Sequence, residues 1–114
     1  MAIREYKELK NLMRSNEEMF DKLENRQWFL LWLKDNISIY NEFERYSIYL
    51  SEHGKRTRYS ARAIIHRMRW DTLIKEKEPT EFKISNNCTP YLARITMLAN
   101  PRLAGMFQLR ANKK

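Results

Sequence analysis

Residues 60–76 read SARAIIHRMRWDTLIKE, and this stretch decides the fold class that we expect. Ala61, Ile64, Ile65 and Met68 recur at intervals of three and four, which is the spacing of one face of an α-helix. Ser60 stands just before them and is a good N-cap residue. The pattern therefore predicts an amphipathic helix over about 60–76.

Helical spacing continues on both sides of this stretch. Two glycines and three prolines supply little material for the frequent turns of a β-sandwich or barrel. Ser15 to Glu18 has the form of a capping box, and 28–33 is expected to be a short buried helix. Thr89-Pro90 and Asn100-Pro101 are typical helix starts. The expected helices cover 2–14, about 16–24, 28–33, 36–53, 60–76, 90–99 and 100–110.

We therefore expect a mainly α fold, a compact bundle of about five or six short helices. Alternation at 82–85 predicts one short strand or wing. The size is that of a single domain over 1–114, in which 1–24 could form a docking or dimerising helical arm.

Several functional classes are excluded or disfavoured by composition. The single cysteine, Cys88, rules out an internal disulfide framework and favours a cytoplasmic setting. The first residues lack the apolar run of a signal peptide, and the apolar run 28–33 is too short to cross a bilayer. Neither a zinc ligand set nor a Gly-rich phosphate loop is evident. We expect no cofactor, no metal and no membrane contact.

The net charge of +8 is unevenly distributed along the chain. Residues 1–53 carry eight basic and ten acidic side chains, whereas 54–114 carry fourteen basic and four acidic ones. Residues 54–70 contain six cations and no acid. Such asymmetry is typical of a chain that binds a polyanion, although a cationic face kept for solubility would look similar.

On the helix 60–76, Arg62, His66 and Arg69 share the face opposite the apolar stripe. No acid lies three or four positions from Arg62 or Arg69, whereas Arg67 can pair with Asp71. Cations also precede the helix N-terminus, which favours anions. The candidate nucleic-acid-binding residues are Lys55, Arg56, Arg58, Tyr59, Arg62, His66, Arg69, Lys83 and Arg94.

Three aromatic residues, Tyr59, Trp70 and Tyr91, lie among these cations and could stack on unpaired bases. We expect Trp70 to be a core residue instead. Tyr59 is the best stacking candidate, although it could equally pack as a hydrophobic staple before Ser60.

A metal-dependent nuclease is a minor alternative. Asp71, Glu81 and Lys83 have the outline of an acid followed by an acid-x-lysine motif, in which two carboxylates hold Mg²⁺. The expected fold has only one strand to support such a site, so we expect no enzymatic activity.

Two stretches carry a family resemblance, namely 59–70 and 82–94, together with Asn100-Pro101 and Gly105-Met106-Phe107. Over about 28–110 the chain resembles short uncharacterised proteins of bacteriophages and prophages. The resemblance implies a phage or mobile-element setting and no particular activity.

Two functional hypotheses follow. The first is a small basic protein that binds DNA or RNA and acts as a non-catalytic regulator. The second is an inhibitor or adaptor directed at a host protein, such as RNA polymerase or, in the manner of anti-CRISPR proteins, a defence nuclease. In either case the N-terminal helix, with Ile3, Tyr6 and Leu9, could dock in a groove or mediate a homodimer.

Overall fold

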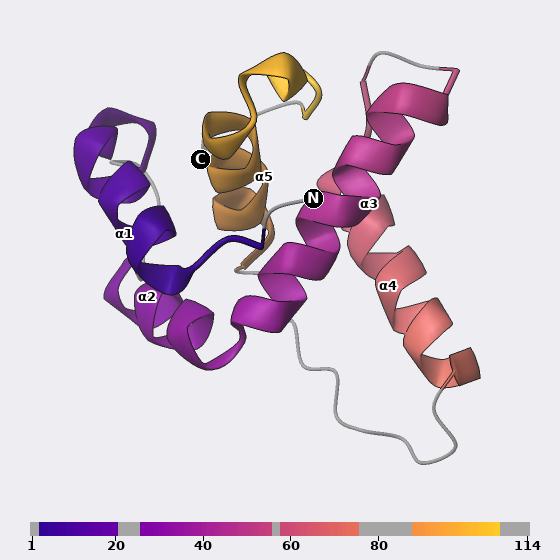
Figure 1. The fold of residues 1–114 in the computed structure, drawn as a ribbon, viewed down its shortest axis with the longest axis horizontal. Helices are drawn as coiled ribbons and strands as arrows, with labels where there is room; N and C mark the ends of the chain where they lie inside the picture. Colours follow the sequence, from indigo (N-terminus) through magenta and orange to yellow (C-terminus); the bar gives the residue numbers. More distant parts are fainter. Residues whose placement is uncertain (1–2, 21–25, 56–57, 76–87, 108–114) are drawn as a thin grey trace, which may run out of the picture.

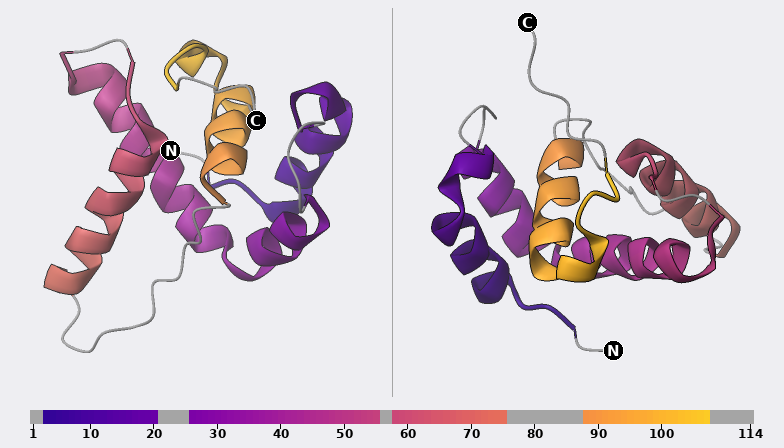
Figure 2. Two further views of the ribbon diagram at one scale, coloured as in Figure 1. Left: turned by 180° about the vertical axis from the view of Figure 1, so that it is seen from behind. Right: turned by 90° about the horizontal axis from the view of Figure 1, so that it is seen from above.

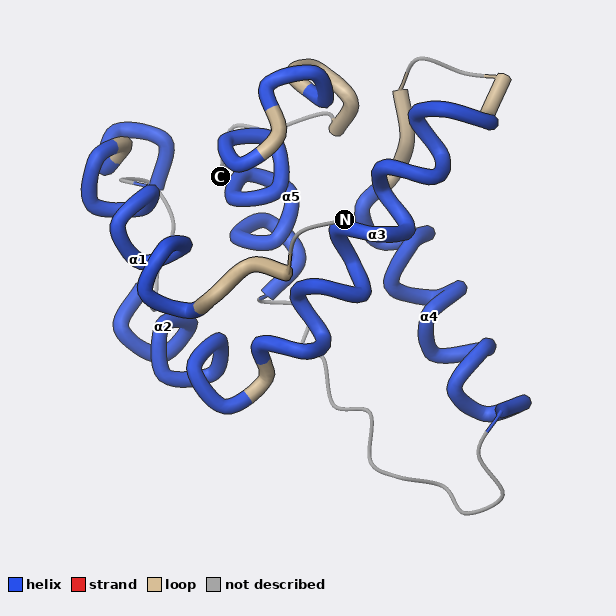
Figure 3. The backbone as a smooth tube through the Cα atoms, viewed as in Figure 1, coloured by secondary structure: helices blue, strands red, loops and turns tan. Residues whose placement is uncertain are grey.

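The helices are α1 (Tyr6–Ser15), α2 (Arg26–Asp35), α3 (Ile37–His53), α4 (Ala61–Lys75) and α5 (Thr89–Ala99), with short 3-10 turns at Glu17–Phe20 and Pro101–Leu103. This computed structural model describes residues 3–20, 26–55, 58–75 and 88–107, the side chains of 72–75 excepted. Its described part is a compact, mainly α globule of five helices, as expected, and it contains no strand (Figures 1 and 3). The strand predicted at 82–85 lies outside the described residues.

Helix α5 lies at the centre of the bundle (Figure 1). It packs against α1, α3 and α4, and six of its eleven side chains are buried. The start predicted from Thr89-Pro90 is confirmed, because Pro90 occupies the first turn, where its missing N–H costs no hydrogen bond. An apolar sequence on nearly every side thus makes α5 the helix that the others surround.

Aromatic rings join α5 to the N-terminal half. Tyr91 stacks on Phe29 of α2 with ring centroids 4.5 Å apart, and on Phe20 at 6.0 Å. All three rings are fully or almost fully buried. Burial on this scale stabilises the fold by about 2 kcal/mol per ring. Cys88 is also buried and fills space next to the start of α5.

A buried carboxylate links three separate segments of the chain. Glu44 on α3 is 3% exposed, and its Oε2 accepts hydrogen bonds from Arg4 Nε at 3.1 Å, Tyr40 Oη at 3.0 Å and Asn100 Nδ2 at 2.7 Å. Arg4 also donates to the carbonyl of Ala99 at 2.8 Å. A buried charge is tolerated only when donors replace the lost water, and these residues supply them.

The segment before α1 is fixed to α3 by backbone contacts as well. Asn41 accepts a hydrogen bond from Arg4 N at 2.8 Å, and its amide donates back to Arg4 O at 3.0 Å. Leu9 and Met13 are buried on the same side of α1. The N-terminal helix therefore packs into the core of its own chain, while Ile3 remains exposed.

Three predicted helix boundaries are wrong. The helix expected over 2–14 begins at Tyr6, because residues 3–5 are not helical. Ser15 does not cap a second helix, because it is the last residue of α1, and a single 3-10 turn follows at Glu17–Phe20. Of the final helix expected from Asn100 to about 110, the described residues up to Phe107 form only the 3-10 turn Pro101–Leu103. Asn100 makes no side-chain cap bond to that turn, because its Oδ1 accepts from Arg4 Nη2 at 3.4 Å and its Nδ2 donates to Glu44. Gly105 then turns the chain with a φ of +83°.

Helix α2 is less buried than its apolar sequence predicts. Phe29 and Leu33 are fully buried, but Trp28 is 40% and Leu31 59% exposed. Helix α2 packs mainly against α1 and α3 at one end of the molecule (Figures 1 and 2), so only one side of it is covered. In the described residues, no helix is long and apolar enough to cross a membrane.

Replacing Glu44 should destabilise the fold strongly. Glu44→Ala leaves Arg4, Tyr40 and Asn100 without their common acceptor, and we expect the free energy of unfolding to fall by about 3 kcal/mol. Urea unfolding followed by circular dichroism measures this change. The matched control is Glu42→Ala on the same helix, which removes an exposed pair with Arg45 and should cost less than about 1 kcal/mol. Equal losses for the two variants would contradict the role assigned to Glu44.

Candidate nucleic-acid interface

The connection between α3 and α4 is built for a close turn. Helix α3 stops at His53, as predicted, and Gly54 N donates to Leu50 O at 2.8 Å. A Cβ on Gly54 would lie 1.7 Å from Tyr59 Oη and 2.6 Å from Leu50 O, so a side chain does not fit there. Tyr59 N donates to Met106 O at 2.8 Å, which fixes the chain just before α4.

Helix α4 begins as the sequence predicts. Ser60 Oγ accepts a hydrogen bond from Ala63 N at 3.3 Å, the geometry of an N-cap. The apolar stripe of Ala61, Ile64, Ile65 and Met68 is buried against α3 and α5. The orientation of α4 is therefore fixed by its buried side, and its opposite side faces solvent.

The solvent side of α4 carries Arg62, His66 and Trp70, all exposed. These three residues, here named the Arg62 face, are four positions apart, so their Cα atoms rise in steps of about 6 Å along one line of the helix. Trp70 is 61% exposed. The face thus combines a cation, an imidazole and an open indole ring.

The prediction that Trp70 belongs to the core is wrong. Two positions separate Trp70 from Met68, and this turns its side chain by about 200° away from the buried stripe. The sequence of 60–76 already indicates that Trp70 lies on the polar side of the helix, because Trp70 is four residues after His66 and eight after Arg62. The other two aromatic candidates are less accessible, since Tyr59 is half-buried and Tyr91 is a core residue.

Three cations in the connection from α3 to α4 and in the first turn of α4 are exposed. Lys55, Arg58 and Arg62 have no carboxylate within ion-pairing distance among the described residues. Arg58 and Arg62 lie within three residues of the start of α4, where unsatisfied N–H groups add positive potential, whereas Lys55 follows the end of α3. The site can therefore attract phosphate oxygens without first breaking an ion pair.

The remaining predicted cations are placed differently. Arg69 is half-buried, and Arg94 on α5 is half-buried with its Nη1 donating to Pro90 O at 3.2 Å. Burial lowers the pKa of Arg94 and outweighs the opposing effect of Tyr91. Arg56 and Lys83 lie outside the described residues. Of the predicted residues, Arg62 and His66 thus lie on the outer side of α4, Arg58 precedes this helix, and Lys55 follows α3.

Asp71 lies on α4 where this helix packs against α3. Its carboxylate accepts Arg67 Nε at 3.2 Å, as predicted, and also accepts the hydroxyl of Tyr46 on α3. The other two residues of the nuclease outline, Glu81 and Lys83, lie outside the described residues. Within the described ranges no three His, Cys, Asp or Glu side chains gather as a metal site.

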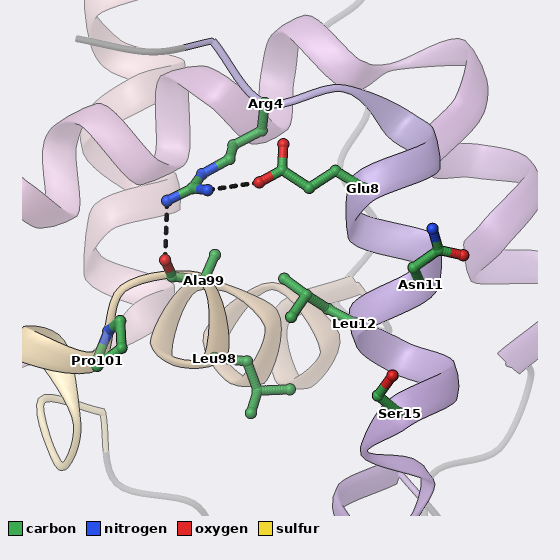
Figure 4. A pocket seen from close by; sticks show the side chains of 8 residues that line it. All are labelled: Arg4, Glu8, Asn11, Leu12, Ser15, Leu98, Ala99 and Pro101. Atoms are coloured by element: carbon green, nitrogen blue, oxygen red, sulfur yellow. Dashed lines mark hydrogen bonds and ion pairs between the residues drawn. The ribbon is translucent and has the colours of Figure 1, made fainter.

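A shallow groove of about 560 Å³ lies between α1 and the end of α5 (Figure 4). Its apolar lining is Leu12, Leu98 and Pro101. Helix α1 also contributes the polar side chains of Glu8, Asn11 and Ser15. Arg4 and Glu8 pair across its end at 2.6 Å. Burial opposes the charge of Arg4, but Glu8 and Glu44 outweigh it and raise the pKa of Arg4. The groove thus offers no unpaired charge to an ionic ligand.

Comparisons with known proteins add no family assignment. No family model matches the chain, and neither curated proteins nor solved structures give a significant match. The geometry of the residues themselves therefore carries the functional argument.

The Tyr46–Asp71 contact predicts a loss of stability at alkaline pH. Burial, and then the hydrogen bond to Asp71, raise the pKa of Tyr46 from 10.0 to about 12. The folded protein keeps this proton to higher pH than the unfolded chain. The stability linked to it is complete below pH 10 and is lost as the pH rises from 10 through 12.

Tyr46→Phe removes this titration, so the variant should lose less stability than the wild type between pH 10 and pH 12. Urea unfolding midpoints at a series of pH values measure the difference. Tyr49→Phe, an exposed tyrosine on the same helix, is the matched control and should follow the wild type. A Tyr46→Phe curve parallel to the wild type would refute the assignment.

Proposed function

We propose that this chain is a non-catalytic nucleic-acid-binding protein that uses the start of α4 and the Arg62 face. The observation that carries the proposal is that Arg62 and Trp70 are both exposed on α4, while Arg58 and Lys55, earlier in the chain, are also exposed cations without a carboxylate partner among the described residues. Cations without carboxylate partners release counterions when they meet phosphates, and this release drives binding to nucleic acid.

The ligand approaches the positive end of a helix in this proposal. Phosphate oxygens would contact Lys55 and Arg58 and would lie near the first N–H groups of α4. Arg62, one turn farther along, extends the contacts along the helix. Such contacts position a nucleic-acid backbone and carry no sequence information, so we expect binding of mixed sequences.

Salt dependence is the first test. With about five phosphates neutralised, the logarithm of the affinity for DNA should fall with the logarithm of the salt concentration at a slope of about −4 to −5. Fluorescence polarisation with labelled mixed-sequence DNA and RNA measures the slope. A slope near zero would reject the proposal.

A charge-matched pair of variants locates the interface. Arg62→Ala should weaken binding and reduce the salt slope by about one, because one phosphate contact is lost. Lys7→Ala on α1, also exposed and far from α4 in the fold, should leave both nearly unchanged (Figure 1). Equal effects of the two variants would show that only the overall charge matters.

A second candidate function is binding to a host protein. Trp28 and Leu31 are exposed one turn apart on α2, and such apolar pairs are common in docking sites. They lie at the opposite end of the molecule from α4 (Figures 1 and 2). A partner that stays bound after nuclease treatment and is lost in Leu31→Glu would favour this candidate.

A further inference from the structure

The exposed ring of Trp70 bears on the form of nucleic acid that the proposed site accepts. Aromatic side chains of this size are normally buried in a core, yet Trp70 is 61% exposed on a helix whose other side is tightly packed. Arg62 and His66, which precede Trp70 on the Arg62 face, are exposed as well. The ring is accessible to a flat partner.

We propose that Trp70 stacks on an unpaired base, so that the ligand of the Arg62 face is single-stranded nucleic acid. This inference rests on the proposed function. The bases of a duplex are stacked on one another and turn only their edges to a protein, whereas the bases of a single strand expose their faces. A tryptophan ring that lies beside cations is the usual platform for such bases.

The order of the groups along α4 fits one strand. The exposed cations lie at the N-terminal end, and Trp70 lies about 12 Å farther along the helix than Arg62. A strand that runs along the Arg62 face would place its phosphates on the cations and a base on Trp70. His66 lies between the two groups and offers a ring nitrogen for a hydrogen bond.

The acid next to Trp70 does not repel this ligand strongly. Asp71 follows Trp70 in the sequence, but its carboxylate is bound to Arg67 and to the hydroxyl of Tyr46. Part of its charge is therefore balanced within the protein. The surroundings of Trp70 thus suit a neutral base better than another phosphate.

The experiment compares one mixed sequence in three forms: single-stranded DNA, single-stranded RNA, and duplex DNA. Polarisation titrations at one fixed salt concentration give the affinities. Trp70→Ala should weaken binding to the single strands about tenfold and change the duplex affinity less than about twofold. Trp70→Phe should keep most of the single-strand affinity, because it keeps an aromatic face.

Trp28→Ala on α2 is the matched control, since it removes the same exposed residue type at the other end of the molecule. It should leave all three affinities unchanged. Because Trp70 is exposed, its variants should have the same urea unfolding midpoint as the wild type. This measurement checks that the variants are folded. Tenfold losses for DNA and RNA single strands alike support stacking on bases in general, and a loss confined to one of them identifies the preferred strand.

Failure of this inference is distinguishable from failure of the proposed function. Stacking is refuted if Trp70→Ala lowers the affinities for single strands and for duplex equally, or lowers neither. In that case, salt-dependent binding by the wild type would still support the proposed function. If polyglutamate competes as well as a single strand, the site recognises negative charge alone, and the inference is also overturned. If the wild type binds none of the three forms at low salt, both proposals fall.

Discussion

The fold depends on how the carboxylate of Glu44 is satisfied inside the bundle. Donors from the N-terminal segment, from α3 and from the residue after α5 converge on one oxygen, so three distant parts of the chain are fixed by one charge. Burial, and then the charge of Glu44, raise the pKa of Tyr40 well above its usual range, which keeps this hydroxyl a donor. With these partners in place, α5 stays in the centre and can receive the apolar sides of α1, α3 and α4.

The charge of the surface near α4 depends on which cations the carboxylates of the protein pair with. Carboxylates of the first half pair mostly within that half, as in Arg4–Glu8, Arg26–Glu17 and Arg45–Glu42, while Glu52 pairs with Arg102. In the described part of the chain, none reaches the cations at the start of α4. The asymmetry of charge along the sequence, together with these exposed cations, is the basis for proposing a polyanionic ligand.

Helix α4 shows how packing creates a presenting surface. Its buried stripe is tightly covered, Ser60 caps its start, and the Tyr46–Asp71 contact joins its later turns to α3. A helix fixed in this way cannot rotate to bury its outer side. Trp70 is therefore held in solvent by the same contacts that stabilise the helix, and the proposed ligand would meet a preformed site rather than one ordered on binding.

Much of the architecture could be predicted from local pattern, because it depends on contacts within a few residues. These features are the mainly α class, the buried stripe and N-cap of α4, the end of α3 at His53, the start of α5 and the Arg67–Asp71 pair. The buried carboxylate, the exposed Trp28 and Leu31, and the shortened segment after Asn100 could not, because each depends on a neighbour brought near by packing. Periodicity reports that a residue is apolar and on which side of a helix it lies, but it does not report whether another helix covers that side.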